Sequence, residues 1–174
     1  MPRIIRALTA LALGVGLLSC ADASPVAVAT PHSAQRSLIG QTLGLIPALL
    51  RCDGLPYDSV SQVVGAAGGT VHIGPHTLVI PPGALAANTV ITAVVSPDTV
   101  NVVRFGPQGL QFAQPAQLTL SYANCPLGGL LAPWWIAYTN DSLSILELEP
   151  TTLHLLQQTL TANIGHFSGY AVAY

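Results

Sequence analysis

Short runs of alternating apolar and polar residues fill the chain from residue 59 onward, and glycine- and proline-containing turns separate them. Runs of this length and spacing predict an all-β fold, more narrowly an antiparallel β-sandwich. Residues 117–122 show the pattern well, because large apolar side chains alternate with polar ones and leave one wet face. No long helical pattern and no glycine-rich phosphate loop interrupts the series. The pattern therefore argues against a parallel α/β nucleotide-binding fold.

The expected strands are bounded by turn residues. Gly74 and Pro75 form a compact hairpin signal, and Pro81 and Pro82 end the next strand because two ladder donors are missing there. Gly83 permits a backbone angle that other residues resist. We predict strands at residues 70–73, 77–80, 89–95, 100–105, 117–122, 134–138, 143–148, 153–156, 160–164 and 167–172.

Charge is scarce in this chain. Only 7% of its residues are charged and none is lysine, against a usual charged share of about 25%. Nucleic-acid binding requires a dense cationic surface, which a few scattered arginines cannot supply. The polar groups of the surface must therefore come mainly from uncharged side chains, namely threonine, serine, asparagine and glutamine. We exclude a nucleic-acid-binding function.

The first residues have the layout of an export signal. Arg3 and Arg6 precede an uncharged apolar stretch at residues 7–18. About 12 apolar residues are too few for a membrane-spanning helix, which needs roughly 20. We interpret residues 1–19 as a signal peptide that is removed.

A lipid anchor is expected directly after this signal. Leu17, Leu18, Ser19 and Cys20 resemble the lipobox of bacterial lipoproteins, in which a diacylglyceryl group is attached to the cysteine. Several acyl chains on Cys20 would hold the protein stably in the cell envelope, with the outer membrane as the expected site. The alternative is ordinary cleavage after Ala23 and a secreted or periplasmic soluble protein.

Three further regions follow the signal. Residues 20–41 read as a flexible tether, 42–60 as an apolar linking segment, and 61–174 as the sandwich domain. Within 38–50 the many leucines and isoleucines predict a short helical segment that packs on the domain and delivers Cys52 to its partner. A membrane-interfacial or partner-binding helix is the alternative. Gly40, Gly44 and Pro47 weaken any helix here.

With Cys20 lipidated, Cys52 and Cys125 remain as an even pair in an oxidising compartment. We expect them to form a disulfide. Two buried free thiols or a metal pair are the alternative, although no C-x-x-C spacing supports one.

Four ordered stretches resemble the ZU-five domain, a family named for zonula occludens proteins and netrin receptors of the UNC-five type and found also in ankyrins and bacterial envelope proteins. The stretches lie at residues 68–71 with 77–85, at 106–112, at 115–120, and at His166, Phe167, Ser168 and Tyr170. The resemblance covers residues 61–174. It implies an antiparallel β-sandwich used mainly as an interaction domain with varied partners.

The resemblance also raises self-cleavage as an alternative function. Some eukaryotic members of the family cut themselves between the phenylalanine and serine of such a triplet. Ser168 Oγ would attack the Phe167 carbonyl to form an ester that water hydrolyses, and His166 would assist as base or proton donor. The competing interpretation is that Phe167 fills the core while His166 and Ser168 share one face of the last strand.

Other chemistry-bearing residues give weaker signals. His72 and His76 lie four apart near one hairpin, but that spacing does not indicate a metal site, and we expect neither metal nor cofactor. Glu147 and Glu149 share a strand face at about 7 Å. We interpret this pair as a solvated face, because glycosidase carboxylates usually converge across a cleft.

Trp134, Trp135 and Tyr138 are candidate binding contacts. Adjacent tryptophans on a strand point to opposite faces, and an exposed ring could stack on sugar or on an apolar patch of a partner. Alternatively, Trp135 lies under a loop or under residues 38–50. Taken together, the sequence predicts a non-enzymatic envelope lipoprotein whose sandwich contacts a protein or polysaccharide partner.

Overall fold

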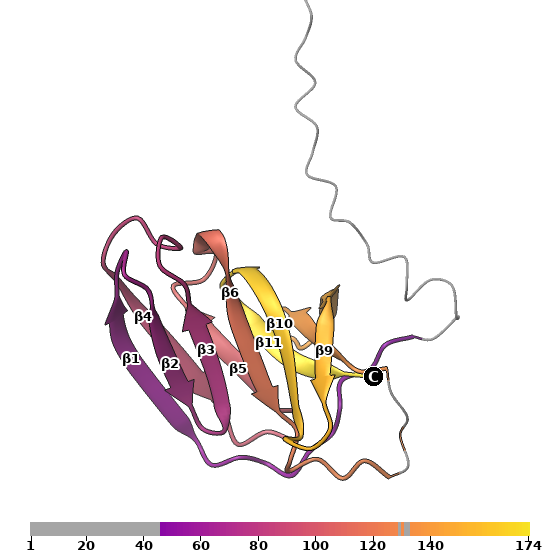
Figure 1. Cartoon of the computed structure of the whole chain (residues 1–174). Helices are drawn as coiled ribbons and strands as arrows, with labels where there is room; N and C mark the ends of the chain where they lie inside the picture. Colours follow the sequence, from indigo (N-terminus) through magenta and orange to yellow (C-terminus); the bar gives the residue numbers. More distant parts are fainter. Residues whose placement is uncertain (1–45, 129, 131–132) are drawn as a thin grey trace, which may run out of the picture. The chain divides into compact units, whose positions relative to one another are not determined.

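The computed structural model describes residues 46–174 except 129, 131 and 132. Two antiparallel sheets pack against each other in this part of the chain, which confirms the expected β-sandwich (Figure 1). No helix within the described ranges is long and apolar enough to cross a membrane. The expected signal peptide, Cys20, the tether and residues 38–45 lie outside the described residues.

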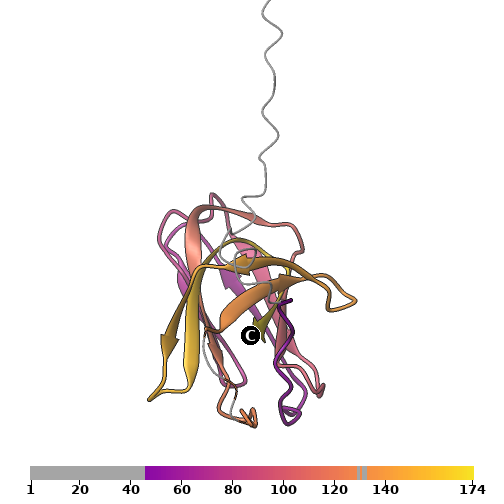
Figure 2. The ribbon, with the colours of Figure 1, turned by 90° about the vertical axis from the view of Figure 1, so that its right-hand side faces the viewer.

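The six-stranded sheet has the order β1-β4-β5-β11-β7-β8, and the five-stranded sheet has the order β2-β3-β6-β10-β9. Figure 2 shows the two layers edge-on. The chain changes sheet repeatedly, so that each sheet contains segments from both ends of the domain. The strands are β1 (Asp58–Val64), β2 (Gly69–Ile73), β3 (His76–Ile80), β4 (Thr89–Val95), β5 (Val102–Gly106), β6 (Gln111–Ser121), β7 (Trp135–Thr139), β8 (Ile145–Glu149), β9 (Thr151–His154), β10 (Thr159–His166) and β11 (Gly169–Ala173).

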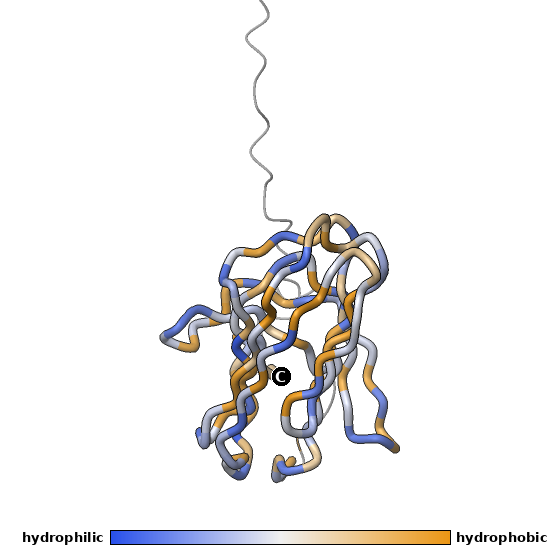
Figure 3. The backbone as a smooth tube through the Cα atoms, turned by 90° about the vertical axis from the view of Figure 1, so that its left-hand side faces the viewer, coloured by the Kyte–Doolittle hydropathy of each residue, from blue (hydrophilic) through white to orange (hydrophobic). Residues whose placement is uncertain are grey.

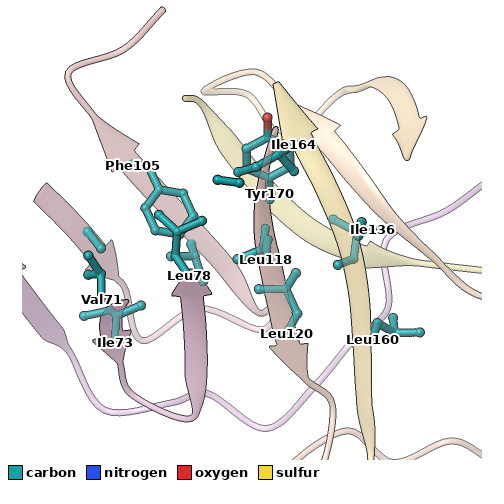
Figure 4. Close-up of a cluster of buried hydrophobic side chains, with 14 of the residues drawn as sticks. Val71, Ile73, Leu78, Phe105, Leu118, Leu120, Ile136, Leu160, Ile164 and Tyr170 are labelled. Atoms are coloured by element: carbon teal, nitrogen blue, oxygen red, sulfur yellow. The ribbon is translucent and has the colours of Figure 1, made fainter. Parts of the chain in front are cut away.

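The core lies between the sheets because alternate residues of each strand point inward. Hydrophobic and hydrophilic residues succeed one another along the strands in Figure 3. Fully burying a large apolar side chain stabilises the fold by roughly 1.5–3 kcal/mol. Figure 4 shows side chains of both sheets meeting in this core: Val71, Ile73, Leu78, Phe105, Leu118, Leu120, Ile136, Leu160, Ile164 and Tyr170.

Two of the glycine turns are required by the backbone. Gly68 has φ +74°, and a Cβ there would lie 2.3 Å from the carbonyl oxygen of Ile80. Gly83 has φ +79° and donates its N–H to the Ala66 carbonyl at 2.8 Å. Both conformations are costly for residues with a side chain. The turn predicted at the double proline is confirmed.

Residues 46–50 are extended, so the helical segment predicted over 38–50 is wrong for its described part. Ala48 N–H donates to the Tyr174 carbonyl at 3.0 Å, and Leu50 N–H donates to the Val172 carbonyl at 2.8 Å. These bonds add the segment to β11 beyond the end of β5. Pro47 lacks the N–H that a helix interior needs, and the N–H groups of Ala48 and Leu50 bond to the end of β11 instead.

The predicted disulfide is confirmed, since Cys52 and Cys125 are bonded at 2.05 Å. Beside it, the side-chain amides of Asn101 and Asn124 exchange two hydrogen bonds, at 2.6 and 3.0 Å. Asn124 also donates to the Asp53 carbonyl. The chain entering the sandwich is therefore fixed by a covalent bond and by the side-chain amides of Asn101 and Asn124.

Most strand boundaries differ from the prediction by one or two residues, as at β5, β8 and β9. Three differences have a clear structural reason. β1 was not predicted, because only Val60 and Val64 mark its inner face between polar residues, and the expected domain start at residue 61 falls inside it. β6 begins at Gln111, and Pro115 lies in the irregular stretch of its pairing with β10, where a missing N–H breaks no regular ladder. β11 begins at Gly169, because Phe167 and Ser168 carry the chain between the sheets.

Candidate functional site

The outer face of the five-stranded sheet carries one row of polar side chains that crosses all of its strands. The row is in register from β2 to β9 and consists of His72, Thr77, Thr119, Thr161 and Thr152. We call these residues and the parallel row Thr70, Val79, Gln117 and Asn163 the threonine face. Its side chains point outward because their strand neighbours, such as Leu78 and Leu118, are buried in the core.

The threonine face is neutral and rich in hydroxyl groups. None of its five strands contains an arginine, aspartate or glutamate. Hydrogen bonds join Thr119 to Thr161 through their hydroxyls at 3.3 Å, and His72 Nδ1 to the Thr77 hydroxyl at 3.2 Å. Each hydroxyl both donates and accepts, and neighbouring strands repeat at about 4.8 Å. The face therefore offers regularly spaced hydrogen-bonding groups to a neutral partner.

The candidate aromatic contacts do not form one surface. Trp134 is buried and packs edge-on against Tyr122 at 4.9 Å between ring centroids. Trp135 is half-buried and pairs with Ala173, to which Leu49 also bridges, so it lies near the entering segment. Tyr138 points to the inner side of the sheet. Only Trp135 and Tyr138 keep exposed area for a contact.

The triplet His166, Phe167 and Ser168 lies where the chain passes from β10 to β11. Phe167 is buried and stacks on Phe105 at 5.3 Å between ring centroids. Ser168 Oγ donates to the Thr139 carbonyl at 3.3 Å. His166 Nδ1 shares a hydrogen bond of 2.9 Å with the Tyr170 hydroxyl. Within the described residues no hydrogen bond joins His166 to Ser168.

One feature of self-cleavage is nevertheless present. The Phe167 carbonyl, which would become the oxyanion, accepts a hydrogen bond of 3.0 Å from Gly109 N–H. A donor in that position stabilises developing negative charge. Nucleophile activation is the missing part, because the imidazole and the hydroxyl are engaged with other groups.

The interpretation of Glu147 and Glu149 as a solvated face is wrong. Glu147 pairs with Tyr138 and Glu149 pairs with the core residue Ile136, so both carboxylates point toward the inner side of the sandwich at its β8 edge. Burial, and then the charge of Glu147, raises the pKa of Glu149 to about 7. Burial and these two carboxylates, together with Tyr138, also raise the pKa of the Tyr170 hydroxyl.

The two hairpin histidines point to opposite faces of the five-stranded sheet. His72 is exposed on the threonine face, whereas His76 is 1% exposed on the inner face. Their side chains cannot meet at one metal ion. No cluster of three or more histidine, cysteine, aspartate or glutamate side chains with metal-binding geometry occurs in the part of the chain that the structure describes.

A comparison with protein-family models finds no family that matches this chain, and a search of curated proteins finds none that is significantly similar. The resemblance to the ZU-five domain therefore stands on its sequence motifs alone. Sequence reasoning did not identify the threonine face, because its row arises from strand register. The available signal was the alternation, within single strands, of threonine and other polar residues with buried apolar residues.

Proposed function

We propose that this protein is a non-enzymatic lipoprotein of the cell envelope, and that its ZU-five-like sandwich is an interaction module for a protein or polysaccharide partner. The export signal and the lipobox at Cys20 support the envelope location. The threonine face is the observation that carries the binding role, because it is neutral and continuous across five strands. Its outer residues are exposed and its central threonines are half-buried.

A neutral polysaccharide fits this face better than a protein does. Sugar hydroxyls can pair with threonine hydroxyls and with the amides of Gln117 and Asn163 without the desolvation of any charge. Protein interfaces usually contain a buried apolar or aromatic anchor. The threonine face offers only Val79, which is 39% exposed.

Sedimentation with insoluble polysaccharides tests this role. The full chain is incubated with cellulose, chitin and the anionic polymer alginate, and the bound fraction is measured. Thr119→Glu places a charge at the centre of the row, and we expect it to abolish binding to the neutral polymers. Thr92→Glu is the matched control, since Thr92 is exposed on the other sheet. Equal binding by both variants would contradict a role for the threonine face.

A protein partner would be detected by crosslinking in the native envelope. A photoreactive residue at Gln117 is compared with one at Thr92, which samples the opposite sheet. A defined protein product from position 117 alone would assign the face to a protein. No specific product, together with no polysaccharide binding, would contradict the proposed function.

Self-cleavage between Phe167 and Ser168 is the second candidate, and the Gly109 N–H on the Phe167 carbonyl is the observation that favours it. Intact-mass measurement of freshly purified and aged protein decides it. Cleavage would yield a fragment from Ser168 to Tyr174, and Ser168→Ala would remove that fragment. One uncut mass at all times would exclude this function.

A further inference from the structure

A groove of about 820 Å³ opens on the outer face of the six-stranded sheet, beside the point where the described chain begins. The segment 46–51 itself lines part of the groove. The remaining lining includes Val100, Leu143, Ile145 and Tyr174. In Figure 1 the indigo start of the described chain passes beside the C-terminus, in agreement with the bridge between Leu49 and Ala173.

The groove is mainly apolar. Leu49 and Leu143 pack against a small cluster formed by Val100, Val102 and Ala171, which is separate from the main core. The groove's one charged side chain, Arg51, donates to the Thr99 hydroxyl at 3.4 Å. Ile46 is 91% exposed and Tyr174 38% exposed at this end of the sandwich. Most of the residues that line the groove are apolar.

The turn before β8 contributes one wall of the groove. Leu143 has φ +59°, a left-handed conformation that is rare for a large residue. Asn140 holds this turn, because its carbonyl accepts from Leu143 N–H at 3.0 Å and its side chain accepts from Ser144 N–H at 2.9 Å. The turn thereby keeps a leucine against the groove in an unfavourable backbone conformation, as functional contacts often do.

The sequence directly before Ile46 has the composition of a ligand for this groove. Residues 38–45 contain Leu38, Ile39, Leu43 and Leu45 and no charge. Because residue 46 belongs to the groove lining, the segment is tethered there at high effective concentration. A separate partner would lack this advantage.

We propose that residues 38–45 dock into this groove as an intramolecular strap. Docking buries the leucines and the isoleucine against Val100, Leu143 and Ile145. It also shortens the free linker between Cys20 and the sandwich to residues 21–37. The strap does not depend on the threonine face, which lies on the other sheet.

Photo-crosslinking in the full chain tests the strap. A photoreactive residue replaces Leu43, the protein is irradiated and reduced, and trypsin then cleaves at its few arginines. The strap lies in the tryptic peptide 37–51, and Leu143, Ile145 and Tyr174 lie in the peptide 105–174. We expect an intrachain crosslink between these peptides, with its acceptor site at residues 143–145 or 174. The same probe at Ala34 is the control and should give no product at that site.

A second variant keeps the test independent of folding. Ile145→Glu places a charge in the groove and should abolish the crosslink. Leu45→Asp, outside the sandwich, should abolish it as well while the disulfide and the near-ultraviolet circular dichroism stay unchanged. A crosslink to another surface, a crosslink between two chains, or no crosslink from position 43 would each overturn the proposal.

Discussion

At the scale of single residues, His76 is the most constrained titratable group of the sandwich. Its Nδ1 accepts a hydrogen bond from Ser121 N–H at 3.1 Å, and its Nε2 has no partner among the described residues. The Nδ1 bond requires an unprotonated Nδ1, so the ring is neutral in the folded protein. Burial lowers the pKa of His76 to about 4.

This lowered pKa predicts acid sensitivity. Between pH 6.5 and about 4 the unfolded chain binds a proton at this site and the folded chain does not, so the contribution of His76 to stability falls as the pH falls. The full loss is about 3 kcal/mol. Urea unfolding of wild type and His76→Leu at pH 7.5 and 4.5 measures it.

The variant should be less stable at pH 7.5, because Ser121 N–H loses its acceptor, but it should lose less stability on acidification. His72→Leu, at an exposed position, is the control and should keep the wild-type pH dependence. Parallel pH dependences for the wild type and His76→Leu would show that His76 does not carry the effect.

At the scale of elements, β8 is the edge of the six-stranded sheet and carries two inward carboxylates. Inward-pointing charges on an edge strand oppose pairing with another chain. Apolar residues at positions 147 and 149 would bury more apolar surface, but the two glutamates protect the edge strand against pairing with another chain. The cost is electrostatic, because Glu149 is partly desolvated and lies near the charge of Glu147.

We predict that Glu149→Gln stabilises the protein at neutral and alkaline pH. The raised pKa of Glu149 means that its stabilising, protonated form is fully present below pH 4.5 and is lost as the pH rises through about 7. Since Glu149 remains partly exposed, solvent screening limits the gain to about 1 kcal/mol. Urea midpoints at pH 5 and 8 check this.

The variant should gain over wild type at pH 8 and differ less at pH 5. Asp141→Asn, in the exposed turn before β8, is the charge-matched control. The slope for Glu149 is opposite to that for His76, so the contributions of these two groups to the free energy of unfolding oppose each other between about pH 4.5 and 6.5. An equal gain at both pH values would contradict the desolvation argument.

At the scale of the whole molecule, the disulfide closes a loop with a sequence separation of 73 residues. We predict that Cys52→Ala with Cys125→Ala lowers the free energy of unfolding by about 4 kcal/mol, because the unfolded chain regains its loop entropy. Chemical unfolding of the double variant, beside wild type with and without reductant, measures the loss. Reduced wild type should match the variant, and undiminished stability of both would contradict the entropic role.

Local pattern determined much of this fold. Alternation and turn residues predicted the hairpin at Gly74, the strand at Thr89–Val95 and the sandwich itself, because side-chain period and backbone turns depend on neighbouring residues only. The pairing of Cys52 with Cys125 was predicted by setting Cys20 aside as the lipidated residue, which left an even pair. Each of these features requires no knowledge of which strands are neighbours.

Tertiary structure decided what depends on register and on which sheet a strand joins. The inward direction of Glu149, the strand-like course of residues 46–50 and the alignment of Thr77, Thr119 and Thr161 all arise from pairings between distant segments. A shift of one residue in the pairing of two strands moves every side chain of a strand to the other face of the sheet. The alternation in the sequence does not determine this register where a strand is largely polar. The sequence by itself therefore determined a sandwich with a disulfide. Long-range pairing assembled the neutral face and the groove.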